Sequence, residues 1–298
     1  SQSGYPFMVF LAVFAIAMPF AGSLMARWGP KKTAMLGGWL VGTGWILASF
    51  SPNISILTIL YGVIGGAGVG IVYGCPITVV AKWFPHKSGL AIGLTVMGFG
   101  ISALLIAPLI KTMIDNPSIG ILNTFLYLGI AFMVVIMLLA QLLSFPPAGW
   151  TPAEIKTAFA ATSAESTPDL SRQAMLKTRN FYALWVIYTI GCLAGLMAIG
   201  IASPVGTEVA KLDTTIAALA VSLFAVFNGL GRPIFGALTD KVGPKHAAIV
   251  SFTMILGASL LIFFLGQGNA TVYLFTFCVL WMCLGGWLAI APTATGIL

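Results

Sequence analysis

The sequence predicts an all-α polytopic membrane protein, and three observations carry this prediction. Hydrophobic residues make up 59% of the 298-residue chain and charged residues only 7%, whereas soluble domains carry about a quarter of their residues as charges. Nine segments are apolar over the roughly 20 residues that a helix needs to cross about 30 Å of hydrocarbon. No segments of about 10 residues alternate in polarity, as the strands of a transmembrane barrel do.

The nine predicted spans follow one another through the chain. Glycine and proline occur inside most of them, which membrane helices tolerate because neighbouring helices satisfy the freed backbone groups. The spans cover residues 5–26, 33–50, 55–81, 88–110, 121–145, 181–203, 214–239, 246–265 and 270–296.

The distribution of cations predicts the orientation in the membrane. Threading the spans back and forth leaves only Lys111 and Lys211 on one side, and an excess of Lys and Arg marks the cytoplasmic side. This asymmetry explains the net charge of +7 without a nucleic acid partner. We therefore expect a multi-pass protein of a bacterial or archaeal cytoplasmic membrane. The cytoplasmic cations are Arg27, Lys31, Lys32, Lys82, Lys87, Lys156, Arg172, Lys177, Arg179, Lys241 and Lys245.

An internal repeat predicts two equivalent halves. The stretches Gly22–Lys31 (GSLMARWGPK) and Gly236–Lys245 (GALTDKVGPK) share one pattern without a gap. Its first glycine lets two helices approach closely, its last glycine allows a tight reversal, and the proline starts the next helix. We expect an N-terminal helical half over residues 1–146 and a C-terminal half over residues 181–298.

A polar cytoplasmic linker, residues 147–180, separates the halves. Thr151-Pro152-Ala153-Glu154 combines a capping threonine, a first-turn proline and a reciprocal glutamate, so a short helix is expected there. The repeat follows the first visible span in the front half but the second span after the linker. Two halves of six helices would then make the chain a fragment that holds helices 2–10 of twelve.

The repeated pattern resembles the loop signature of the major facilitator superfamily, which lies between helices 2 and 3 and again between helices 8 and 9. Asp240 matches the acidic position of that signature, whereas Ala26 replaces it in the front copy. This replacement argues against a charge pair at the front loop. The resemblance implies a gating role for the two loops, carried by Gly22, Arg27, Gly29, Lys31, Gly236, Asp240, Lys241, Gly243 and Lys245.

Five further stretches resemble one branch of that superfamily, the oxalate/formate antiporters and related bacterial monocarboxylate (lactate-type) carriers. They are residues 66–74, 82–93, 175–185, 228–233 and 285–292. The resemblance implies a secondary transporter of small carboxylates that works by alternating access, by antiport or with protons. It also implies a protein that needs no cofactor or metal and functions as a monomer when full length.

One asymmetry in the repeat predicts the substrate site. Arg232 precedes Pro233 where Met18 precedes Pro19, and a charge at the centre of a membrane helix costs about 2.5–3.5 kcal/mol. No Asp, Glu or His lies within the hydrophobic body of any predicted span. Because a guanidinium matches a carboxylate in two parallel hydrogen bonds, we predict that Arg232 binds an anionic carboxylate. The alternatives are an arginine that snorkels to the interface or one that pairs with a helix outside the chain.

Three other residues are predicted to border this site. Asn228 lies one turn before Arg232 on the same face and can hydrogen-bond either substrate or arginine. A similar position in the animal monocarboxylate carriers holds an aspartate that serves proton coupling. By resemblance, Tyr73 lines the cavity from the front half, with an interhelical hydrogen bond as the equal alternative. Trp287 is the weaker candidate, since oxalate carriers place a tryptophan where this chain has Leu284; the difference favours a substrate such as lactate.

Other function classes fit the sequence less well. An enzyme would need convergent nucleophiles, bases or metal ligands, and a channel or receptor would not need the two-half repeat. The cysteines Cys75, Cys192, Cys278 and Cys283 all lie in predicted spans without metal-ligand spacing. The nearest alternative is a transporter of a neutral solute or drug in the same superfamily, which would have no need of Arg232.

Overall fold

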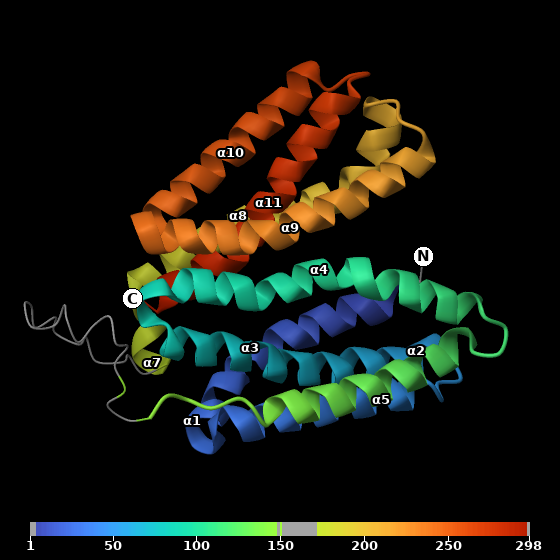
Figure 1. The fold of residues 1–298 in the computed structure, drawn as a ribbon, viewed down its shortest axis with the longest axis vertical. Coiled ribbons are helices and arrows are strands. Elements are labelled where there is room, and N and C mark those ends of the chain that lie inside the picture. The colour runs from blue at the N-terminus through green and yellow to red at the C-terminus, as the bar shows by residue number, and fades with distance from the viewer. Residues whose placement is uncertain (1–3, 148–149, 151–171, 297–298) are drawn as a thin grey trace, which may run out of the picture. The chain divides into compact units, whose positions relative to one another are not determined.

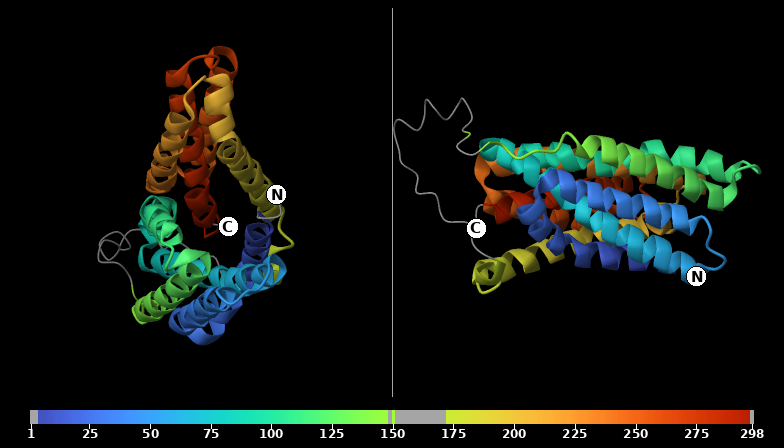
Figure 2. Two further views of the ribbon diagram at one scale, coloured as in Figure 1. Left: turned by 90° about the vertical axis from the view of Figure 1, so that its right-hand side faces the viewer. Right: turned by 90° about the horizontal axis from the view of Figure 1, so that it is seen from below.

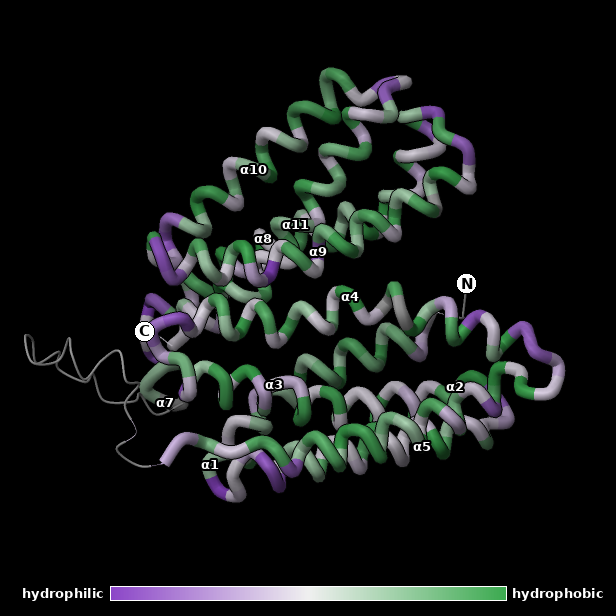
Figure 3. Tube along the Cα trace, viewed as in Figure 1, coloured by the Kyte–Doolittle hydropathy of each residue, from purple (hydrophilic) through white to green (hydrophobic). Residues whose placement is uncertain are grey.

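The computed structural model describes residues 4–147, 150 and 172–296, and all secondary structure in these residues is helical (Figure 1). Eight of the described helices are long and apolar enough to cross a membrane. Their bodies are hydrophobic and the hydrophilic residues gather toward the connections, as Figure 3 shows along the trace. The all-α prediction is confirmed.

The first helix explains why nine predicted spans become eight helices. Helix α1 (Tyr5–Ala48) runs for 44 residues through the first two predicted spans and is interrupted at Gly29, which has φ 78° and ψ 168°. Glycine reaches this positive φ without the steric penalty that a Cβ would impose. Pro30 then continues as the first residue of the second limb. The two limbs correspond to the two spans predicted from the sequence.

The contacts divide the chain into two units, each described separately below. The first unit contains Ser1–Trp83 and Ile106–Trp150, and the second contains Phe84–Leu105 and Thr151–Leu298. Helix α4 (Ser88–Asp115) contributes its first part to the second unit and its last turns to the first. The predicted division into residues 1–146, 147–180 and 181–298 stays a prediction. The expected linker helix at Thr151–Glu154 lies outside the described residues.

In the first unit, α1 packs against a long helical segment and against α5 (Gly120–Ala140). The segment comprises α2 (Ile54–Leu57), the π-helical η2 (Thr58–Gly65) and α3 (Gly66–Trp83). Small residues bring these helices together: a Cβ at Gly68 would collide with the backbone of Val41, and one at Gly42 would collide with Met133. Close backbone approach of this kind is typical of membrane helix interfaces.

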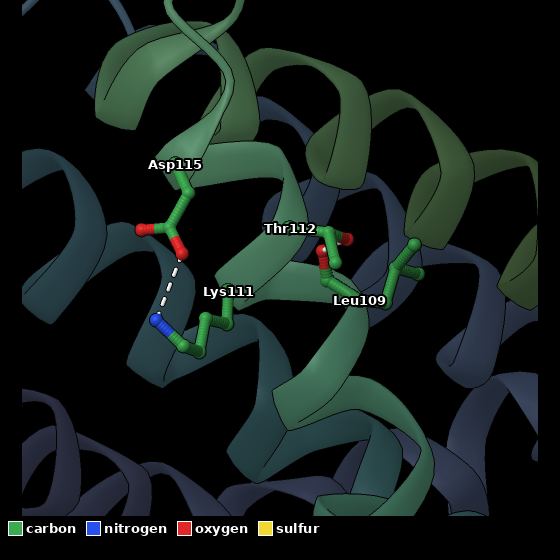
Figure 4. Close-up of polar contacts among 4 residues, drawn as sticks. All are labelled: Leu109, Lys111, Thr112 and Asp115. Carbon is green, nitrogen blue, oxygen red and sulfur yellow. Dashed lines mark hydrogen bonds and ion pairs between the residues drawn. The ribbon is translucent and has the colours of Figure 1, made fainter.

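The end of α4 carries an exposed ion pair in the first unit. Lys111 Nζ lies 2.8 Å from Asp115 Oδ2, one turn away on the same helix (Figure 4). The two side chains are 76% and 60% exposed. Pairs at such exposed i, i+4 positions contribute about 0.3–0.5 kcal/mol, so this one serves as a reference for the stability experiments below.

In the second unit, three helices gather around α11 (Ala270–Thr295), as the views in Figure 2 show. They are α8 (Arg179–Pro204), α9 (Thr214–Val242) and α10 (Pro244–Leu265). The unit also contains the short α7 (Arg172–Met175) and the π-helical η4 (Val205–Val209).

Aromatic side chains form the centre of the second unit. Tyr273 is fully buried, contacts Phe224 and Phe277, and donates its hydroxyl to the carbonyl of Ala202 at 2.8 Å. A buried tyrosine usually finds such a partner, because an unsatisfied hydroxyl is costly in an apolar environment. The contact fixes α11 against the end of α8.

The two repeated loops share one backbone geometry. Gly243 has φ 83° and ψ 159°, close to the values at Gly29, and Pro244 begins α10. The predicted reversal at the two glycines is therefore confirmed. The predicted close approach is present at Gly236, where a Cβ would collide with the backbone of Gly89. It is absent at Gly22 within the described residues, because a Cβ there would meet no atom within 4 Å.

Candidate functional site

Glycines position the predicted arginine inside the second unit. Gly93 of α4 faces the backbone of Arg232, and Gly285 of α11 faces the carbonyl of Asn228. A side chain at either glycine would collide with those carbonyls, so only glycine allows α9 to approach both neighbours this closely. As a result Arg232 is only 2% exposed.

Two neutral oxygens accept hydrogen bonds from the guanidinium of Arg232. Its Nη1 donates to the carbonyl of Val96, and its Nη2 donates to Oδ1 of Asn228 at 3.1 Å. The ring of Phe99 lies over the guanidinium, with its centroid 5.3 Å from Cζ. Asn228 is held in turn, because its amide donates to the carbonyl of Trp281 at 3.1 Å. These oxygens and the ring stabilise the buried positive charge.

A cavity of about 480 Å³ opens beside this arginine within the second unit. It has one charged lining residue among those described, a few hydroxyl, thiol and amide groups, and a mostly aliphatic remainder. Ligand pockets commonly have this composition, in which a few polar groups orient a ligand against apolar walls. The lining residues are Phe99, Tyr188, Thr189, Cys192, Leu193, Leu196, Ile199, Asn228, Arg232, Leu284 and Leu288.

Of the predicted substrate residues, the structure brings together Arg232 and Asn228. Tyr73 belongs to the first unit, where it contacts Phe14 edge to face at 5.5 Å and lines a separate cavity of about 250 Å³. Its predicted role in binding therefore rests on the sequence alone.

Trp287 is not among the described residues that line the cavity beside Arg232. It is fully buried, its ring centroid lies 5.1 Å from that of Phe252, and it lines a different cavity of about 600 Å³. Leu284, by contrast, lines the cavity beside the arginine. The position at which oxalate carriers of the resembling family have tryptophan thus carries an aliphatic wall here.

Sequence reasoning missed two aromatic residues of the cavity. Phe99 lies between Gly98 and Gly100, and Tyr188 lies in the middle of a predicted span. An aromatic residue flanked by Gly98 and Gly100 was the available signal for Phe99, because small neighbours leave room around a ring. No signal in the sequence distinguished Tyr188 from the other tyrosines.

The second repeated loop is tied to the start of α4 by Asp240. Its Oδ1 accepts the backbone N–H of Gly89 at 2.7 Å, and its Oδ2 accepts that of Leu90 at 2.8 Å. A carboxylate at a helix N-terminus satisfies orphan N–H groups and interacts favourably with the helix dipole. The other charged residues of the two loops, Arg27, Lys31, Lys241 and Lys245, are exposed.

Residues 1–297 match the sequence profile of the Major Facilitator Superfamily. The chain belongs to this superfamily. The family match and the eight apolar helices together make it a multi-pass membrane protein. The fold agrees with that of a solved superfamily transporter, FucP in the outward conformation, with a TM-score of 0.66 and 17% identity over 99% of this chain and 81% of that one.

Several curated superfamily members are similar in sequence. The oxalate:formate antiporter of Oxalobacter formigenes is 30% identical over 79% of this chain and 54% of its own length. Apicoplast pyruvate carrier 1 of Toxoplasma gondii is 24% identical over 99% of this chain and 63% of that protein. Monocarboxylate transporter 13 of Rattus norvegicus is 26% identical over 88% of this chain and 58% of its own length. The chain therefore spans a little over half the length of these relatives.

Proposed function

We propose that the protein is a secondary transporter of small carboxylates and that Arg232 binds the substrate carboxylate. The observation that carries this proposal is a buried guanidinium that borders an apolar cavity and donates to the oxygens of Val96 and Asn228. The names of the relatives support it, because an oxalate:formate antiporter, a pyruvate carrier and a monocarboxylate transporter are all similar to this chain.

The energetics of the cavity favour an anion. Burial has removed most of the water from the Arg232 guanidinium, which is 2% exposed, and electrostatic attraction to a carboxylate is stronger where water is excluded. The guanidinium has five N–H groups in a planar fork, and hydrogen bonds to charged groups contribute about 1.5–3 kcal/mol each. A carboxylate can therefore bind in two parallel hydrogen bonds, replacing or adding to the contacts with Val96 and Asn228.

The walls of the cavity favour one carboxylate attached to a small apolar or hydroxylated remainder. Arg232 is the one charged residue among the described lining residues, and Leu284 and Leu288 of α11 contribute aliphatic walls. A second carboxylate, as in oxalate, would find no cation among them. Lactate is thus a better match than oxalate for this part of the site.

The pair Arg232–Asn228 supports exchange over proton coupling at this site. Neither an amide nor a guanidinium changes protonation at physiological pH, so the pair has no proton to move with the substrate. We accordingly propose antiport of carboxylates by alternating access, in which the site is exposed to each side of the membrane in turn.

Transport by the complete gene product in proteoliposomes tests this function. We expect saturable exchange of lactate, with weaker exchange of oxalate or formate. Arg232→Ala should lower the apparent affinity for lactate by at least about 10–150-fold, the effect of losing even one charge-assisted hydrogen bond of about 1.5–3 kcal/mol. The affinity of Arg232→Lys for lactate should lie between those of the wild type and Arg232→Ala, since lysine keeps the charge but lacks the planar fork.

The exposed Lys111 provides a matched control, because Lys111→Ala also removes a cation but leaves the cavity intact. Lactate exchange that survives in Arg232→Ala would contradict the assignment of the site. Transport of a neutral solute with no response to carboxylates would favour the other superfamily function considered above.

A further inference from the structure

We propose that Phe99 is a positioning residue for the substrate carboxylate, because its ring stabilises the guanidinium of Arg232 in the orientation that binds a carboxylate. This inference rests on the proposed carboxylate function and goes beyond it by assigning a role to α4. It makes the affinity for the anion depend on an aromatic ring that contributes no hydrogen bond.

The first argument is the geometry of the contact. The ring centroid of Phe99 lies 5.3 Å from Cζ of Arg232, within the roughly 6 Å over which a ring face attracts a cation. The guanidinium is 2% exposed, and cation–π attraction is strongest where the cation has lost its water. The ring therefore replaces part of the hydration that Arg232 loses by burial.

The second argument is the chemistry of the groups around the guanidinium. Val96 and Asn228 accept hydrogen bonds from its N–H groups through oxygen atoms, whereas Phe99 contributes only an aromatic ring. A carboxylate binds a guanidinium through two parallel N–H groups. An acidic residue at position 99 would compete with the substrate for those N–H groups, but a phenyl ring stabilises the cation without supplying a negative charge.

The third argument is the placement of α4. Val96 and Phe99 are three residues apart, so they share one face of the helix. Gly93 and Gly100 flank them, and a Cβ at Gly100 would crowd the backbone of Gly229 on α9. The glycines thus bring α4 close enough to α9 for both contacts with Arg232.

The fourth argument is the exposure of the ring. Phe99 is 61% exposed and borders the cavity, so it is not a core residue whose loss would leave a large void. A leucine there would retain much of the apolar contact and lose only the π face. Substitutions at this position can therefore separate the electrostatic role from packing.

The test compares Phe99→Leu, Phe99→Trp and a series of fluorinated phenylalanines at position 99 in the complete gene product. The measurement is the KM and maximal rate of lactate exchange in proteoliposomes. Phe99→Leu should raise KM by about 2–30-fold with little change in maximal rate. Phe99→Trp should keep KM close to that of the wild type, because the indole ring offers the strongest cation–π face.

The fluorinated series separates electrostatics from shape. Each fluorine withdraws density from the ring face with a small change in size, so log KM should rise steadily with the number of fluorines. A KM within twofold of wild type for Phe99→Leu, or a flat fluorine series, would overturn the inference. Phe263→Leu, which alters a 79% exposed ring on α10, is the matched control.

Arg232→Ala in the same preparation distinguishes the two possible failures. If lactate exchange depends on Arg232 while the Phe99 series is flat, only the role of Phe99 is wrong. If lactate is not carried, or is carried equally well without the arginine, the proposed function fails and this inference fails with it.

Discussion

Removal of the Asp240 carboxylate tests the contact between the second repeated loop and the start of α4. Asp240→Ala deletes two acceptors, which lie 2.7 and 2.8 Å from the N–H groups of Gly89 and Leu90. Hydrogen bonds to charged groups contribute about 1.5–3 kcal/mol. Because Asp240 is only partly buried, we expect a total loss of about 2–4 kcal/mol in the free energy of unfolding. Asp240→Asn should lose about half, since an amide oxygen still accepts one bond.

The assay is thermal unfolding in detergent, followed with a fluorogenic thiol reagent. Cys75, Cys278 and Cys283 are buried, so they react only when the helices separate. A loss of 1 kcal/mol in stability lowers the unfolding midpoint by about 2–4 °C in a protein of this size. Asp240→Ala should therefore lower the midpoint by roughly 5–15 °C.

The exposed acid at the other end of α4 is the control for this experiment. Asp115→Ala also removes a carboxylate, but its pair with Lys111 is solvent-exposed and contributes about 0.3–0.5 kcal/mol. Its midpoint should stay within about 2 °C of wild type. Equal midpoints for Asp240→Ala and Asp115→Ala would refute the reasoning.

Two further substitutions test the packing that supports the site. Gly285→Ala places a methyl group against the carbonyl of Asn228. The resulting overpacking should cost about 1–3 kcal/mol, lower the thermal midpoint and weaken lactate binding. An unchanged midpoint together with unchanged lactate binding would contradict the close approach of α9 and α11. Tyr273→Phe removes the hydroxyl bond to the carbonyl of Ala202, which still accepts the backbone N–H of Val205. The same melting assay should show a loss of about 0.5–1.5 kcal/mol while the KM for lactate is unchanged, and an unaltered melt would show that the hydroxyl bond contributes nothing.

The fold was largely predictable because membrane spans give a strong sequence signal. Twenty apolar residues in succession have few alternatives in a bilayer, and the described helices follow the predicted spans closely. The glycine–proline reversals were predictable for a local reason, since only glycine adopts the positive φ found at Gly29 and Gly243 without a penalty. The open space beside Gly22 was not predictable, because a repeat does not show what each copy packs against.

The site was predictable only where it is local in the sequence. Arg232 and Asn228 are four residues apart on one helix, and the expected contact between them is present. Val96 and Phe99 lie more than a hundred residues upstream, and their contacts with Arg232 depend on how α4 and α9 pack. A single sequence contains no record of that packing beyond the glycines that permit it.

The register of α11 shows a second limit. Three residues advance a helix by about 300°, which leaves Trp287 about 60° away from Leu284. That difference is small in a sequence pattern but large in a bundle, where it separates the cavity beside Arg232 from the packing side toward Phe252. Sequence spacing alone was too coarse to assign the indole to one side.

The central claim, that Arg232 binds a carboxylate, is tested most directly by equilibrium binding of lactate and its neutral analogue lactamide to the purified complete gene product. The two ligands have nearly the same shape and differ in the charge that the arginine recognises. We predict that the wild-type protein prefers lactate by about 10-fold or more and that Arg232→Ala loses this preference while its weak affinity for lactamide is unchanged. An undiminished preference for lactate in Arg232→Ala would contradict the account.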